Sequence, residues 1–106
     1  EAPAANQDAA ARALKLMDRW DARAHGRLFG PGLDAERIRG FLAQVKADLG
    51  RCRIGPPRTS TPRDVTYGLE CERGGAAMRV RLDDGAPPRI VAFEIRKDPG
   101  PSVCTD

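Results

Sequence analysis

The spacing of apolar residues along the chain changes at Gly50, and this change predicts the fold class. Before Gly50, apolar side chains recur every three or four residues, the period of an amphipathic α-helix. After Gly50 they alternate with polar ones, the period of a strand with one buried face. The pattern predicts an α+β protein in which two N-terminal helices pack on a curved antiparallel sheet of three or four strands.

Two helices are predicted in the first half of the chain, separated by a Gly-Pro-Gly sequence. The first covers residues 8–27, with Asn6 or Asp8 as its N-cap. The second begins after Asp34, a good N-cap residue, and ends at Gly50, which tolerates a left-handed C-cap. Its one-sided apolar stripe consists of Ile38, Phe41, Leu42, Val45 and Leu49.

The alternating pattern in the second half of the chain predicts the strands of the sheet. A first strand starting at residues 51–54 is interrupted by Pro56 and Pro57, which suits an edge strand because proline donates no hydrogen bond. An alternating strand at 65–72 leads through a Gly-Gly hairpin turn to a second alternating strand at 78–83. The last strand, at 90–95, is the most apolar and is expected at the centre of the sheet.

The length of 106 residues fits one domain. We expect a disordered lead-in at 1–7, a single α+β domain at 8–97 and a tail at 98–106. Only five residues are Phe, Trp or Tyr, so the core is expected to consist mainly of aliphatic side chains. No apolar run has the length needed to cross a bilayer, so no membrane span is predicted.

The charge pattern argues against a nucleic-acid partner. The formal net charge of +3 comes from 18 basic and 15 acidic residues that are spread along the whole chain. A nucleic-acid-binding protein usually gathers its basic residues on one element. The densest basic stretch, at 51–63, has no aromatic residue within it to stack on a base. A basic nucleic-acid-contacting module is therefore kept only as the third interpretation.

Several segments together resemble a known family. The first half has a helix with a central Trp20, a Phe-Gly-Pro-Gly break, and a second helix that ends in Asp-Leu-Gly. The second half has a strand with Tyr67, an Arg-Val-Arg-Leu-Asp-Asp-Gly hairpin and a closing Arg-Ile-Val-Ala-Phe-Glu-Ile strand. Over residues 8–97 this order resembles small exported bacterial domains of unknown function with the ketosteroid-isomerase-like, or nuclear-transport-factor-like, cystatin-like cone fold.

The resemblance implies a curved sheet wrapped on the helices, with a cavity at the wide end of the cone. Members of the family bind small ligands, dimerise through the sheet or carry out acid–base chemistry. The chain departs from the enzymatic members because it has no clear inward Asp–His pair. The resemblance therefore implies a binding domain, and a homodimer formed through the sheet is compatible with it.

The three cysteines fit no zinc-binding pattern, because they form no C-x-x-C pair and no histidine is near them. If the first two strands pair around residues 60–62, Cys52 and Cys71 fall nearly opposite and can form a disulfide. The alternative is two ordinary core thiols. Cys104 is the odd cysteine, which could reach back to another cysteine or pair between molecules.

A disulfide would suit an oxidising compartment. The opening Glu-Ala-Pro-Ala-Ala sequence is also typical of a mature N-terminus left after cleavage of an export signal. We therefore expect the protein to be periplasmic or secreted in a bacterium.

The candidate ligand-binding residues are apolar and aromatic. A cone cavity could be lined by Trp20, Phe29, Phe41, Tyr67, Met78 and Phe93. The alternative is that these side chains form an ordinary core. His25, the only histidine, could act as a general base with Asp21 one helical turn earlier, or could simply be an exposed residue at a helix end. The Asp-Asp-Gly at 83–85 is interpreted as a hairpin turn and not as a calcium loop.

These observations favour a non-enzymatic exported binding or accessory domain. It would hold a partner protein or a small apolar ligand at its sheet face or cone mouth, without a cofactor or a metal. The alternative is an isomerase- or lyase-type enzyme of the same fold that uses Tyr67 together with His25 or Asp21.

Overall fold

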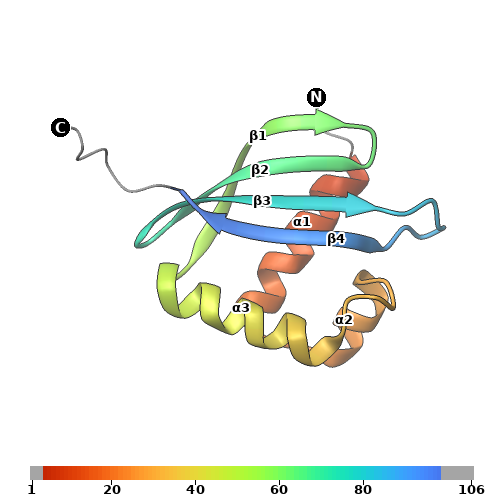
Figure 1. Ribbon diagram of the computed structural model, residues 1–106, viewed down its shortest axis with the longest axis horizontal. Coiled ribbons are helices and arrows are strands. Elements are labelled where there is room, and N and C mark those ends of the chain that lie inside the picture. The colour runs from red at the N-terminus through yellow and green to blue at the C-terminus, as the bar shows by residue number, and fades with distance from the viewer. Residues whose placement is uncertain (1–3, 99–106) are drawn as a thin grey trace.

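The computed structural model describes residues 4–98, which form three α-helices followed by a four-stranded antiparallel sheet (Figure 1). The helices are α1 (Ala4–Asp18), α2 (Ala22–Leu28) and α3 (Ala35–Leu49). The predicted α+β class is confirmed. The predicted number of two N-terminal helices is wrong, because the first predicted helix is divided into α1 and α2.

The division between α1 and α2 has a local cause at Asp21. Its carboxylate accepts hydrogen bonds from the backbone N–H groups of Arg23 and Ala24, at 3.0 and 3.3 Å. An aspartate in this position starts a new helix, because its side chain replaces the backbone acceptors that the first turn lacks. The apolar spacing continues through this cap, so spacing alone did not reveal the break.

The N-terminal boundary also differs from the prediction. Residues 4–7, which were assigned to the lead-in, belong to α1. Asn6 is fully buried and does not cap the helix. Its side-chain amide instead donates to the backbone carbonyls of Arg63 and Val80, at 3.0 and 2.9 Å. These bonds attach the start of α1 to the sheet.

The strands are β1 (Cys52–Thr61), β2 (Asp64–Cys71), β3 (Gly74–Leu82) and β4 (Ile90–Lys97), and they lie in the order β1-β2-β3-β4. The prediction that the last strand is central is therefore wrong. Each strand pairs with its neighbour in sequence, so the last strand becomes an edge. The connections are turns at 62–63 and 72–73 and a longer segment at 83–89. The predicted Gly-Gly turn is wrong, because Gly74 and Gly75 belong to β3. Its apolar character has another cause, because Ile90 and Ile95 are buried in the core.

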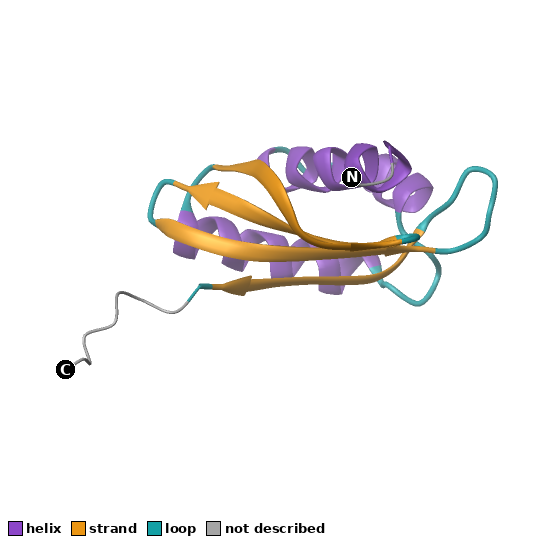
Figure 2. Ribbon diagram, turned by 90° about the horizontal axis from the view of Figure 1, so that it is seen from above, coloured by secondary structure: helices purple, strands orange, loops and turns teal. Residues whose placement is uncertain are grey.

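Seen from above, α1 lies on one side of the sheet (Figure 2). α1 crosses behind the strands and contacts β1 and β3, whereas α3 runs along the β4 edge (Figure 1). The sheet is twisted without being strongly curled, so the predicted curved sheet is not matched. No helix within residues 4–98 is long and apolar enough to cross a membrane.

The core lies between the helices and the inner face of the sheet. The predicted stripe of the second helix is buried with one exception, since Ile38, Leu42, Val45 and Leu49 are buried and Phe41 is exposed. The inward positions of β2 and β3 complete the core, namely Val65, Tyr67, Leu69, Ala76, Met78, Val80 and Leu82.

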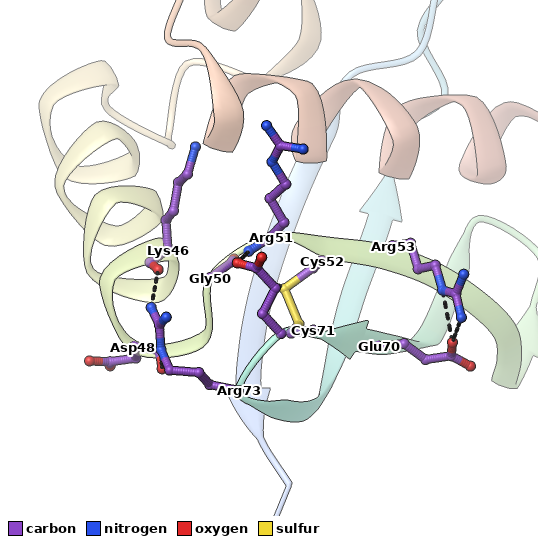
Figure 3. Close-up of a disulfide and its surroundings, with 10 residues drawn as sticks. Lys46, Asp48, Gly50, Arg51, Cys52, Arg53, Glu70, Cys71 and Arg73 are labelled. Atoms are coloured by element: carbon purple, nitrogen blue, oxygen red, sulfur yellow. Dashed lines mark hydrogen bonds and ion pairs between the residues drawn. A yellow bond between two sulfur atoms is a disulfide. The ribbon is translucent and has the colours of Figure 1, made fainter.

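A disulfide between Cys52 and Cys71 joins the start of β1 to the end of β2, as predicted (Figure 3). The two residues are direct partners in the antiparallel register. The alternative of two ordinary core thiols is thereby excluded in this structure. Cys104 lies outside the described residues.

The β2–β3 turn is also attached to the end of α3 beside this disulfide (Figure 3). The guanidinium of Arg73 donates to the carbonyls of Lys46, Ala47 and Asp48, at 3.3, 2.8 and 3.2 Å. The carbonyls of Ala47 and Asp48 belong to the last turn of the helix and have no partners within it, whereas the carbonyl of Lys46 also accepts from the N–H of Gly50 at 2.8 Å. Arg73 therefore acts as a C-terminal cap supplied by the sheet.

Candidate functional site

The structure divides the six predicted ligand-binding residues among three places. Tyr67, Met78 and Phe29 are buried in the core, with exposed fractions of 1%, 0% and 2%. Phe41 and Phe93 line a groove between α3 and β4. Trp20 lines a different groove, between α1 and α2. One shared cavity for all six is therefore not formed.

Four of the aromatic residues nevertheless belong to one row of rings with His25. Trp20 lies 5.5 Å from His25, and His25 stacks on Phe29 at 4.9 Å between ring centroids. Phe29 meets Phe93 edge-to-face at 5.3 Å, and Phe93 meets Phe41 in the same way at 6.2 Å. The row runs from the surface at α1–α2, through the core, to the surface at α3–β4.

His25 is a buried member of this row and not an exposed residue at a helix end. Its side chain is 7% exposed, and its Nε2 lies 2.9 Å from the carbonyl oxygen of Leu33. The Asp21 carboxylate caps α2 and has no hydrogen bond to the ring within residues 4–98. Asp21 therefore does not orient His25 as the general base that was considered from the sequence.

Tyr67 is enclosed on the inner face of β2. Its hydroxyl has no hydrogen-bond partner among the described residues. Burial raises the pKa of the phenol, because the charged phenolate would lose its hydration. A neutral hydroxyl that is out of contact with solvent does not suit proton transfer to a ligand.

Replacement of Tyr67 by phenylalanine is expected to raise the free energy of unfolding by about 1 kcal/mol, because it removes a buried hydroxyl without a partner. Urea unfolding followed by circular dichroism measures the difference. Tyr67→Ala serves as the control and is expected to lose about 3–5 kcal/mol through the cavity it leaves. A loss of stability in Tyr67→Phe would show that the hydroxyl has a partner.

The groove between α3 and β4 has a volume of about 580 Å³. Its floor is apolar, with Leu33 and Ile38 beside the paired rings of Phe41 and Phe93. Its rim is charged with both signs and consists of Asp34, Glu36, Arg37, Glu94 and Arg96.

Phe41 is 37% exposed in this groove. Within residues 4–98, Phe41 and Val91 are the only large apolar residues that remain exposed, and Val91 also belongs to β4. Of these two, Phe41 lines the groove, where its ring lies beside that of Phe93.

The backbone of β4 is open toward the groove. Asp98 N–H donates to Gly75 O, at 2.9 Å. Gly75 and Asp98 are therefore a hydrogen-bonded pair, and along an antiparallel ladder such pairs alternate with pairs that are not hydrogen-bonded. Under the observed register, the N–H and C=O groups of Phe93, Ile95 and Lys97 therefore point away from β3.

The other edge and the start of β4 are less suited to pairing. β1 contains Pro56 and Pro57 and has two register shifts, and both features hinder the pairing of an edge strand with another strand. At the start of β4, the carbonyl of Ile90 accepts a hydrogen bond from Gly30 N–H at 2.8 Å. The open stretch of regular backbone is therefore at 93–97.

The outer face of the sheet, which was predicted as a docking surface, carries a network of charged side chains. Its ion pairs are Arg53–Glu70, Arg58–Asp98, Arg79–Asp64 and Arg96–Glu94. Hydrogen bonds from Arg79 and Arg58 lower the pKa of Asp64 and of Asp98, respectively. These charges are neutralised within the face, so this face offers no apolar docking surface.

The Asp-Asp-Gly segment begins the connection between β3 and β4, which covers 83–89. The carboxylate of Asp83 accepts hydrogen bonds from the backbone N–H groups of Arg89 and Gly85, both at 2.9 Å, and these bonds lower its pKa. This carboxylate therefore holds the backbone of the connection, which is longer than the predicted hairpin turn.

Comparisons of this chain with protein-family models, with curated proteins and with solved structures found no match. The interpretation of the α3–β4 groove therefore rests on its own geometry.

Proposed function

We propose that this protein is a non-enzymatic binding domain that holds an extended segment of a partner protein in the α3–β4 groove. The segment would lie beside β4 as an added strand. The observation that supports this proposal is the juxtaposition of an exposed Phe41 with the outward-facing backbone groups of Phe93 and Ile95.

The geometry of the groove suits strand addition. An added strand lies about 4.8 Å from its neighbour and pairs with the outward N–H and C=O groups of β4. Every second side chain of the added strand then points toward the apolar floor at Phe41 and Phe93. A volume of about 580 Å³ lies within the range of roughly 300–1,000 Å³ that is usual for binding pockets.

The chemistry of the groove indicates the kind of segment. Alternate apolar side chains would occupy the floor, and polar ones would face solvent. The rim carries both signs of charge, from Glu36 and Glu94 and from Arg37 and Arg96, so it selects no single charge. Main-chain hydrogen bonds would supply affinity, and the aromatic floor would supply preference for apolar residues.

The disulfide supports a location outside the cytoplasm as part of the same proposal. Disulfides persist in oxidising compartments and are rare where thiols are kept reduced. With the Cys52–Cys71 bridge, the domain would act in the periplasm or after secretion. The resemblance to the ketosteroid-isomerase-like group, whose members include binding domains, is compatible with this proposal.

Selection of linear peptides from a random display library on the immobilised protein tests the proposal. We expect selected sequences with apolar residues at alternate positions. The substitution Phe41→Asp should weaken their binding by about tenfold or more, because it places a charge on the apolar floor. Ala43→Asp, an exposed position on the same helix outside the groove, is the matched control and should bind normally.

A second variant examines the backbone contacts. Lys97→Pro removes an outward N–H group and leaves the bonds between β3 and β4 in place, so it should weaken binding without loss of the fold. Amide shift changes on peptide addition should be centred on residues 93–97. Binding that is indifferent to Phe41→Asp, or shift changes centred elsewhere, would exclude the α3–β4 groove as the site.

A further inference from the structure

A second groove lies between α1 and α2 on another part of the surface, with a volume of about 850 Å³. Its wall includes the half-buried side chains of Trp20 and Ala24, with Leu16 and Leu28 at the base. Basic side chains line its rim, namely Arg12, Lys15, Arg19 and Arg27.

The acidic residues of this groove are already engaged. The Asp18 carboxylate lies 3.5 Å from Lys46 Nζ, and the Asp21 carboxylate accepts from two backbone N–H groups of α2. No ion pair within residues 4–98 includes Lys15, Arg19 or Arg27, and only Arg12 of the rim has a partner, Asp8. The groove therefore presents cations whose charge is not neutralised by a neighbouring carboxylate.

This arrangement differs from that on the outer face of the sheet. There, four arginines lie within 4 Å of carboxylates, in the pairs Arg53–Glu70, Arg58–Asp98, Arg79–Asp64 and Arg96–Glu94. In the α1–α2 groove the excess of positive charge is combined with a concave surface and an aromatic ring. A ligand that complements the groove must carry negative charge and an apolar group close together.

We infer that the α1–α2 groove binds an acidic amphipathic segment of a partner protein. Its carboxylates would pair with Lys15, Arg19 and Arg27, and its apolar side chains would pack on Trp20 and Ala24. A confined groove with an apolar wall favours such a segment over nucleic acid, whose backbone needs a continuous track of cations. The inference does not depend on the function proposed for the α3–β4 groove.

The groove contains its own reporter, because Trp20 is the only tryptophan in the chain. The probe is a synthetic amphipathic peptide with glutamate on one face and leucine on the other. Its addition should produce a saturable blue shift of the tryptophan emission. The same peptide with lysine in place of glutamate should produce none. The affinity should fall by about tenfold between low and high salt, because the contacts involve exposed charges.

Charge reversal assigns the binding to this groove. The double variant Lys15→Glu/Arg19→Glu should weaken binding of the acidic peptide by about tenfold or more. The control Arg39→Glu/Arg89→Glu makes the same change in net charge at exposed positions outside the groove and should bind almost normally. Circular dichroism spectra of both variants should match that of the unmodified protein.

Three results would overturn the inference. The first is the absence of any emission change with the acidic peptide. The second is an equal loss of affinity in the two double variants, which would assign the effect to net charge. The third is a single-stranded oligonucleotide that gives the same emission change and displaces the peptide, which would make the groove a nucleic-acid site. Selected peptides that bind the α3–β4 groove should be unaffected by Lys15→Glu/Arg19→Glu, so the two proposals can fail separately.

Discussion

Replacement of Phe29 by alanine is expected to lower the free energy of unfolding by about 3–5 kcal/mol, the usual loss for a large buried ring. The ring is 2% exposed, stacks on His25 and meets Phe93 edge-to-face. Its removal leaves a cavity in the middle of the aromatic row. Because interiors are closely packed, the neighbours can relax only in part to fill it. Urea unfolding at neutral pH measures the loss.

The matched control is Phe41→Ala, the same substitution at the surface end of the row. Phe41 is 37% exposed, so the variant removes less buried surface, and we expect a loss of less than about 1.5 kcal/mol. Under the proposed function, this variant instead weakens peptide binding. Equal losses of stability in the two variants would contradict the distinction between a buried and an exposed end of the row.

Removal of the disulfide by Cys52→Ala/Cys71→Ala is expected to lower the free energy of unfolding by about 3 kcal/mol. The bridge joins residues with a sequence separation of 19, and a loop of that length restricts the unfolded chain by about this amount. The bridged position is also the point where the β2–β3 turn, the start of β1 and the end of α3 meet (Figure 3). Loss of the bridge should therefore loosen this end of the sheet first.

A reductant provides the control for the disulfide. Reduction should destabilise the unmodified protein by about the same amount and should leave the double variant unchanged. Thiol counting in denaturant without reductant should find Cys104 reactive and Cys52 and Cys71 protected. A protein whose stability does not respond to reductant, and in which all three cysteines react, would contradict the bridge.

The sequence predicted the features that depend on neighbours along the chain. The change of period at Gly50 separated helices from strands, and Asp34 and Gly50 were identified as the caps of α3. The alternation of apolar residues identified β2 and β3, but the predicted Gly-Gly turn is wrong, because Cys71 pairs with Gly74 and the turn lies at 72–73. The disulfide followed from the register of β1 with β2. Each of these features arises from spacing within a short segment.

The sequence did not predict features for which the same local pattern fits two different structures. The apolar spacing of α1 continues into α2, and only the hydrogen bonds of Asp21 show that a new helix begins there. The last strand was predicted to be central because it is apolar, but β4 lies at an edge of the sheet. His25 was expected at the surface, because nothing near it in sequence shows that Trp20 and Phe29 enclose it.

The sequence by itself determined the α+β class, most of the core and the pairing of Cys52 with Cys71, because periodicity and turn residues act over short distances. The tertiary structure alone decided which aromatic residues stay exposed. Phe41 faces a groove between α3 and β4, and Trp20 faces another between α1 and α2. Such gaps arise where elements far apart in sequence pack together, and they depend on the relative positions of those elements and not on the pattern within any one of them.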